Sequence, residues 1–93
     1  MALEVIKRDG LREPFNAKKI RKAITVVAKR AKLPKRRRDE VVEQVAKAAI
    51  QLAEGKEQIA TSEIREKILS ELDRIEPVVS VAWRNYEQKK KKA

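Results

Sequence analysis

The chain contains neither cysteine nor histidine among its 93 residues. The lack of cysteine excludes disulfide bonds, thiolate metal sites and thiol nucleophiles. The lack of histidine removes the most frequent general base and the most frequent metal ligand together. The carboxylates are dispersed along the sequence, with no spacing typical of a metal site. The composition therefore predicts a protein that is not an enzyme.

Long hydrophobic runs are also missing. No apolar segment approaches the roughly 20 residues that cross a bilayer. The first residues have neither the basic start nor the apolar stretch of a signal peptide. We therefore expect a cytoplasmic protein without membrane contact.

Aromatic residues make up only 3% of the chain, and its 42% hydrophobic residues are mostly aliphatic. Because they are spread among 41% charged residues, they favour amphipathic helices over a β-sandwich. The length suits one domain. The net charge of +10, from 24 Lys and Arg against 14 Asp and Glu, favours polyanionic partners such as nucleotides, nucleic acid or acidic proteins.

The first fifteen residues have the pattern of a β-hairpin. Val5 and Ile6 precede Asp9-Gly10, a dipeptide that readily adopts the positive φ angles of a tight turn. Pro14 cannot donate a hydrogen bond to a neighbouring strand, so the second strand should lie at a sheet edge. Alternation along that strand places three side chains on one face: Leu11, Glu13 and Phe15.

Helical periodicity begins after Asn16, a residue suited to cap a helix. The first helix should end at Leu33-Pro34, and the second at Gly55. The apolar face of the first helix contains Ile20, Ala23, Ile24, Val27 and Ala31, and that of the second contains Val41, Val42, Val45, Ala48, Ala49 and Leu52.

Two further helices follow. Thr61 or Ser62 should cap the third, and Pro77 should open the fourth, since proline suits the first helical position. Residues 58–60 are too short to classify, and a small third strand is one interpretation. The predicted apolar faces contain Ile64, Ile68, Leu69, Leu72 and Ile75, then Val79, Ala82, Trp83 and Tyr86.

These elements predict a mainly α, α+β domain in which four helices are capped by an N-terminal hairpin or by a small three-stranded sheet. No helix can bury its apolar face alone, so the helices should pack together with the hairpin closing one end. We expect residues 1–88 to form the domain and the Lys-rich residues 89–93 to form a disordered tail.

The functional signal lies between the hairpin and the first helix. Lys7 and Arg8 end a strand beside a tight turn, and Lys18 and Lys19 lie in the first turn of a helix. Anions are favoured at helix N-termini, and arginine adds a planar fork for phosphate oxygens. The pattern thus suits a triphosphate cradle. From spacing alone, however, the plainer interpretation as solvated hairpin cations is favoured, because basic turns are common.

The run K-R-D-G-x-x-E-x-F-N-x-x-K-I at residues 7–20 is similar to the opening signature of the ATP-cone family. These domains occur at the N-terminus of many ribonucleotide reductase large subunits and in the zinc-ribbon repressor of reductase genes. The remaining elements agree with the family in order and length. Because family members are usually joined to a catalytic barrel or a zinc ribbon, the chain resembles either a free-standing cone or a fragment.

The resemblance implies a phosphate site formed by Lys7, Arg8 and Lys19. It implies that Glu13 and Asn16 meet the ribose or the base, or order the hairpin. For Glu13, a simple cross-strand ion pair is the alternative.

The resemblance also implies an adenine site in which Ile20 forms an apolar floor and Thr61 supplies a hydrogen bond. A cation of the last helix, Arg84 or Lys89, would close the phosphate end. The alternatives are a core role for Ile20, a helix cap at Thr61 and a solvated Arg84.

The family analogy predicts a non-catalytic regulatory module that binds ATP or dATP, with any Mg²⁺ arriving on the nucleotide. The bound nucleotide would control self-association into a homo-oligomer, or docking onto a partner such as a reductase subunit or a transcription regulator.

A second function class rests on the segment Lys29–Arg38, which carries seven cations in ten residues. It could bind nucleic-acid phosphates. No aromatics interleave these cations, so base stacking is not indicated. A solvated loop balanced by Asp39 and Glu40 is the plainer alternative.

Overall fold

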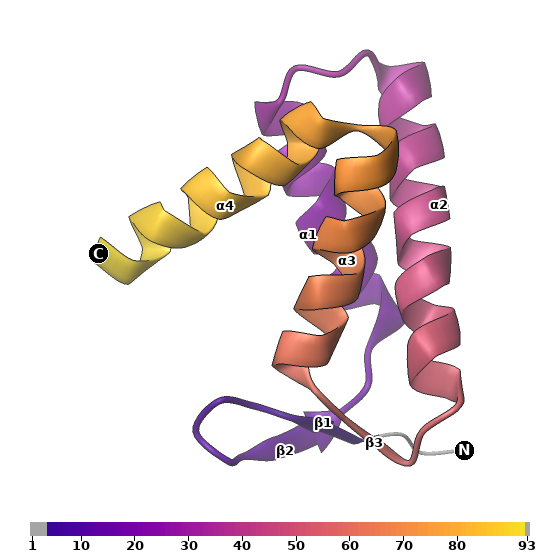
Figure 1. The fold of residues 1–93 in the computed structure, drawn as a ribbon, viewed down its shortest axis with the longest axis vertical. Coiled ribbons are helices and arrows are strands. Elements are labelled where there is room, and N and C mark those ends of the chain that lie inside the picture. The colour runs from indigo at the N-terminus through magenta and orange to yellow at the C-terminus, as the bar shows by residue number, and fades with distance from the viewer. Residues whose placement is uncertain (1–3, 93) are drawn as a thin grey trace.

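The computed structural model describes residues 4–92 of the chain. Three helices run alongside one another, a small sheet lies across one end, and the last helix turns away from the others (Figure 1). The predicted mainly helical α+β architecture is confirmed. The elements are β1 (Glu4–Ile6), β2 (Arg12–Pro14), α1 (Ala17–Arg30), α2 (Lys35–Glu54), β3 (Gln58–Ala60), α3 (Thr61–Ile75) and α4 (Pro77–Lys92).

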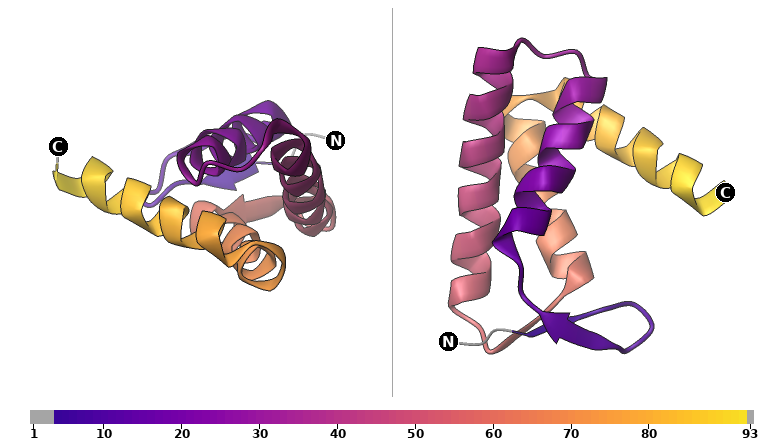
Figure 2. Two further views of the ribbon diagram at one scale, coloured as in Figure 1. Left: turned by 90° about the horizontal axis from the view of Figure 1, so that it is seen from above. Right: turned by 180° about the vertical axis from the view of Figure 1, so that it is seen from behind.

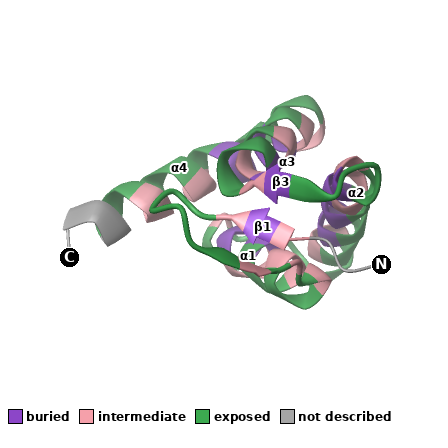
Figure 3. Ribbon diagram, turned by 90° about the horizontal axis from the view of Figure 1, so that it is seen from below, coloured by how far each residue is buried: buried purple, intermediate pink, exposed green. Residues whose placement is uncertain are grey.

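The sheet has three strands in the order β2-β1-β3, so residues 58–60 do form a strand. Val5 of the central strand pairs with Glu13 of antiparallel β2 and with Ile59 of parallel β3. Pro14 therefore lies on an edge strand, as predicted. Gly10 adopts a φ of 88° in the hairpin turn, a conformation open to glycine at little cost. Figure 3 shows β1 and β3 side by side beneath the helices.

Asn16 caps α1, which confirms the predicted start of this helix. Its Oδ1 accepts hydrogen bonds from the N–H groups of Lys18 and Lys19, at 2.9 and 3.3 Å. Only Phe15 and Asn16 separate β2 from α1. The start of the helix is consequently held beside the hairpin.

The start of α3 differs from the prediction. Thr61 is the first helical residue, Ala60 occupies the N-cap position, and no side chain caps the helix. The reason is that β3 runs directly into α3: pairing with β1 keeps Ala60 extended, at φ −77° and ψ 147°. Pro77 opens α4, as predicted.

The core is formed by the facing sides of the helices, whose arrangement Figure 2 shows, together with Val5 of β1 and Ile59 of β3. On α1 the buried set includes Ala28, which was not predicted, whereas Ala23 is exposed. On α2, Ala46 and Ala53 are buried, whereas Ala48 and Leu52 are half-buried. The buried hydrophobic cluster consists of Val5, Ile24, Val27, Ala28, Val41, Val42, Val45, Ala46, Ala49, Ala53, Ile59, Ile64, Ile68, Leu72 and Val79.

The last helix continues to Lys92. Its end thus does not coincide with the domain boundary predicted between residues 88 and 89. Residue 93 and the side chains from position 90 onward lie outside the described part of the chain. The division into a domain and a disordered tail stays a prediction. Within residues 4–92, none of the helices combines the length and the apolar character that spanning a bilayer requires.

Candidate functional site

A pocket of about 690 Å³ lies where the hairpin meets the starts of α1 and α3 and one face of α4. Its volume falls within the roughly 300–1,000 Å³ typical of small-molecule sites. The strand order explains its position. Because β3 pairs with β1 and leads directly into α3, the first turn of α3 is brought beside the hairpin.

Seven of the eight side chains predicted to bind a ligand line this pocket. The end of β1 and the following turn supply two, β2 supplies one, the start of α1 supplies three, and the start of α3 supplies one. The structure therefore brings together residues that are up to 54 positions apart in sequence. They are Lys7, Arg8, Glu13, Asn16, Lys19, Ile20 and Thr61.

Two cations from different elements meet at one carboxylate. The Nζ of Lys7 lies 3.4 Å from Oε2 of Glu13, and the Nζ of Lys19 lies 3.9 Å from the same oxygen. The cross-strand ion-pair alternative for Glu13 thus describes a real contact. Arg8 also lines the pocket and has no acidic partner among residues 4–92. These groups form a cationic side suited to an anion.

The starts of two helices border the same space. The side-chain oxygen of Asn16 uses two N–H groups of α1, whereas no side chain caps α3. Thr61 and Ser62, the first residues of α3, line the pocket. Helix N-termini favour anions through unpaired N–H groups and the helix dipole. The backbone therefore adds to the attraction of the lysines and arginines.

Several lining residues of the pocket are apolar. Ile20, Phe15 and Trp83 line it, and each is half-buried. The Nε1 of Trp83 is buried and has no hydrogen-bond partner among the described residues. A surface of aliphatic and aromatic side chains suits a flat heterocycle. The pocket thus combines cationic and apolar lining residues.

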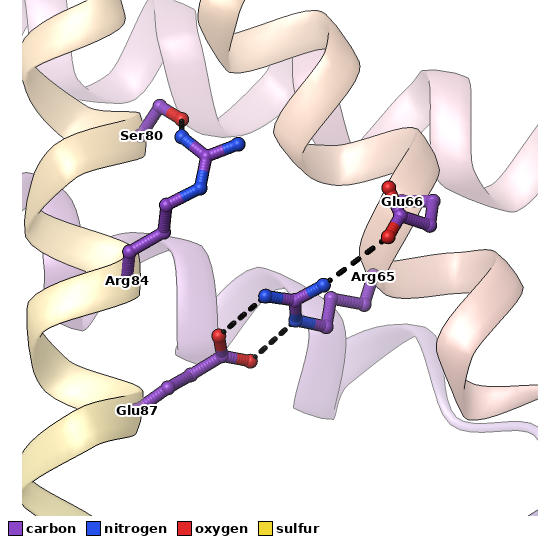
Figure 4. Close-up of polar contacts among 5 residues, drawn as sticks. All are labelled: Arg65, Glu66, Ser80, Arg84 and Glu87. Atoms are coloured by element: carbon purple, nitrogen blue, oxygen red, sulfur yellow. Dashed lines mark hydrogen bonds and ion pairs between the residues drawn. The ribbon is translucent and has the colours of Figure 1, made fainter.

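Arg65 and Glu87, which were not predicted, join α3 to α4 in the wall of the pocket (Figure 4). The Nε of Arg65 donates to Oε2 of Glu87 at 2.7 Å, and its Nη2 donates to Oε1 at 2.9 Å. Nη1 donates to Glu66 at 3.3 Å. The hydrogen bonds that Arg65 donates to Glu87 raise the pKa of Arg65. The pair is bidentate, the geometry in which arginine binds a carboxylate most specifically.

Helical spacing offers a signal for Arg65, and one for Glu87 only once Trp83 is known to line the pocket. Arg65 follows Thr61 by four positions, and Glu87 follows Trp83 by four. Residues four apart lie on the same face of a helix. A predicted pocket residue at Thr61 could therefore have pointed to Arg65 one turn later. Trp83 and Glu87 could not be located without knowing how α4 packs.

Arg84 is the predicted residue that does not line the pocket. Its Nη1 donates to Oγ of Ser80 at 2.6 Å and lies 3.5 Å from Oδ1 of Asp73 (Figure 4 shows the Ser80 contact). The guanidinium is engaged at the junction of α3 and α4, and a role for Arg84 at the phosphate end stays a prediction. Lys89, the alternative cation, does not line the pocket either.

The lining groups can bind and orient a ligand through charge, hydrogen bonds and apolar contact. Across the described residues, no group of three acidic side chains is placed to hold a metal ion. The cations and helix starts can bind an anion, and the aliphatic and aromatic side chains can contact a flat apolar group.

Comparison with known proteins agrees with this geometry. The family model described as the ATP cone domain matches residues 3–92, nearly the whole chain. Among curated proteins, no sequence matches the chain significantly.

Proposed function

The chain belongs to the ATP cone family of nucleotide-binding regulatory domains, and on that premise we propose that its pocket binds ATP or dATP. The bound nucleotide controls the assembly or the activity of a partner. The protein releases the nucleotide unchanged, since its role is regulatory. It works in the cytoplasm.

One observation carries the proposal: Lys7, Arg8 and Lys19 line the same pocket as Ile20 and Trp83. A nucleoside triphosphate has a strongly anionic end and a flat heterocyclic end. The three cations and the uncapped start of α3 suit the phosphates. The apolar wall suits adenine, with Ile20 as its floor.

Three polar residues supply the remaining contacts in this arrangement. Glu13, which only accepts hydrogen bonds when ionised, would take them from the ribose hydroxyls or the adenine amino group. The Oδ1 of Asn16 is occupied by α1, so its side-chain NH₂ is the group that would donate to the nucleoside. The hydroxyl of Thr61 would bond near adenine. Mg²⁺ would enter on the triphosphate.

Regulation follows from the elements that share the pocket. The hairpin, α1, α3 and α4 all contribute to it, so a bound nucleotide contacts four parts of the fold at once. It can shift assembly only if it binds one assembly state better than the other. By family analogy, the controlled species is a homo-oligomer, a ribonucleotide-reductase-type subunit or a transcription regulator.

Calorimetric titration with ATP, dATP and GTP, with and without Mg²⁺, tests this proposal. We expect saturable binding of ATP or dATP that exceeds binding of GTP at moderate salt. Light scattering after size-exclusion chromatography, with and without nucleotide, then tests self-association. Equal affinity for ATP and GTP, or the absence of saturable binding, would contradict the proposed adenine site.

A further inference from the structure

The connection between α1 and α2 forms a basic corner, defined here as the seven cations of the segment Lys29–Arg38. It lies at the end of the helices away from the sheet, at the top of Figure 1 and in the rear view of Figure 2. The pocket opens at the sheet end. The two cationic features are therefore separate.

Only two of these cations have a clear role within the fold. The Nε of Arg37 lies 2.9 Å from Oε2 of Glu76, and its Nη2 donates to the carbonyl of Ile75 at 3.1 Å. Arg30 lies over the ring of Tyr86, 4.7 Å from its centroid. Both contacts join the corner to α3 and α4.

The other five cations have no acidic partner among residues 4–92. Of the two carboxylates that could balance the corner, Glu40 lies 3.7 Å from Arg37, and Asp39 has no ion pair within that part of the chain. Five cations of the corner therefore form no ion pair with Asp39 or Glu40 within that part of the chain: Lys29, Lys32, Lys35, Arg36 and Arg38.

The positions of several cations are unfavourable for the fold itself. The first turn of α2 is entirely basic, and Pro34 at its N-cap provides no side-chain hydrogen bond. Cations are disfavoured at the positive end of a helix dipole. Lys32 has a φ of 62°, a conformation that glycine or asparagine adopts more readily. These cations are thus not explained by the stability of the monomer.

We propose that the basic corner binds the phosphate backbone of duplex DNA without reading its sequence. The exposed large hydrophobic residues of the described chain are Leu11, Val78 and Val81, so the corner lacks the apolar anchor usual at the centre of a protein interface. It also lacks aromatics on which single strands stack. The wide major groove of B-form DNA admits a protruding helix end, whereas the deep, narrow groove of A-form RNA does not.

A triple variant, Lys32→Gln, Lys35→Gln and Arg36→Gln, removes three exposed cations without acidic partners. The matched control, Lys18→Gln, Lys22→Gln and Lys47→Gln, removes the same charge from exposed lysines outside the corner. Fluorescence anisotropy with a labelled DNA duplex, at about 50 and about 200 mM salt, compares them with the parent chain.

The parent chain should bind with an affinity that falls steeply with salt. Because each neutralised phosphate contributes about −0.9 to the logarithmic salt slope, the corner variant should lose two to three such contributions and at least about tenfold in affinity at the lower salt concentration. The affinity of the control variant for DNA should fall less than about threefold, because only its net charge has changed.

Folding is checked by the melting temperature. Removing cations from the start of α2 relieves an unfavourable dipole interaction, so the corner variant should melt no lower than the parent chain. Equal losses in the two triple variants would overturn the proposal, as would tighter binding of polyglutamate or of duplex RNA than of duplex DNA. ATP affinity should not change in the corner variant, because the proposal is independent of the pocket.

Discussion

At the residue scale, Glu13 contacts two of the cations that line the pocket. It holds Lys7 from the hairpin and Lys19 from α1 within 4 Å of one oxygen. These contacts were predictable in outline because the hairpin and α1 are joined by only two residues, which keeps their side chains close. Arg65, Trp83 and Glu87 were missed because their positions depend on how distant helices pack.

Arg8 is the cation of the pocket for which the simplest residue-scale prediction can be made. Arg8→Ala should weaken ATP binding about tenfold or more, since a charge-assisted hydrogen bond is worth about 1.5–3 kcal/mol. Calorimetric titration measures this loss, and circular dichroism should show unchanged helicity. Arg12→Ala is the matched control, because Arg12 pairs with Glu4 in the same hairpin and does not line the pocket. Equal affinities of the two variants would argue against the assigned cradle.

Asp73 supplies a pH-dependent prediction. Hydrogen bonds from Ser80 and then from Arg84 lower its pKa below the ordinary value. A carboxyl with a lowered folded-state pKa contributes stability above the unfolded-state pKa, about 3.9, and loses it as the pH falls through the folded-state value. Asp73→Asn should therefore melt below the parent chain at neutral pH.

The difference in melting temperature between Asp73→Asn and the parent chain should become smaller as the pH falls below about 4. Thermal melts at neutral and strongly acidic pH measure it. Asp39→Asn removes the same charge from an exposed position outside this network and serves as the control. A difference for Asp73→Asn that stays constant with pH would show that the Asp73 carboxylate does not stabilise the fold.

At the element scale, periodicity and turn chemistry predicted the hairpin and four helices, because each is governed by local preferences. The apolar faces were less well predicted. Ala23 lines the pocket instead of the core, and Ala28 is buried. Which residues of α1 are buried depends on the elements that pack against this helix. The absence of a side-chain cap on α3 also has a tertiary cause, the pairing of β3 with β1.

The docking of α4 against α3 gives the prediction at this scale. Arg65→Gln removes the bidentate pair with Glu87. Both side chains are about one-third exposed, so solvent screening limits the loss to about 0.5–1 kcal/mol. For a domain of this size that corresponds to a melting temperature lower by about 2–8 °C. High salt should reduce this decrease in melting temperature, because salt screens exposed ion pairs.

Arg74→Gln is the control for the Arg65 variant. Arg74 donates to Glu71 at 2.7 Å within α3 and is 60% exposed, so its removal breaks an ion pair without loosening α4. Thermal melts should show the larger decrease for Arg65→Gln. Equal decreases would mean that the Arg65–Glu87 pair does not help to hold α4.

At the scale of the whole molecule, the fold separates the cations that line the pocket from those of the basic corner. Net charge alone predicted polyanionic partners but could not assign them. The topology separates two groups of cations, because the sheet gathers the hairpin, α1, α3 and α4 around one pocket, while the α1–α2 connection lies at the other end. The size of the pocket and its apolar wall could not be inferred from sequence, since both depend on the packing of α4.

Because four elements share the pocket, nucleotide binding should stabilise the entire domain. A ligand at a hundred times its dissociation constant adds about 2.7 kcal/mol to the free energy of unfolding, which should raise the melting temperature by about 10 °C or more. Calorimetric melts with ATP, and with GTP as the control, measure this effect. A GTP shift equal to that of ATP would contradict selective binding of adenine.

Nuclear magnetic resonance of the ¹⁵N-labelled chain during titration with ATP shows directly whether the nucleotide binds in the pocket. Trp83 is the only tryptophan, so its indole N–H gives a single resonance that reports on the pocket. If ATP occupies the pocket, this resonance and the amides of Lys7, Arg8, Lys19 and Thr61 should shift together and saturate. Shifts concentrated in residues 29–38, with the Trp83 resonance unchanged, would contradict binding in the pocket.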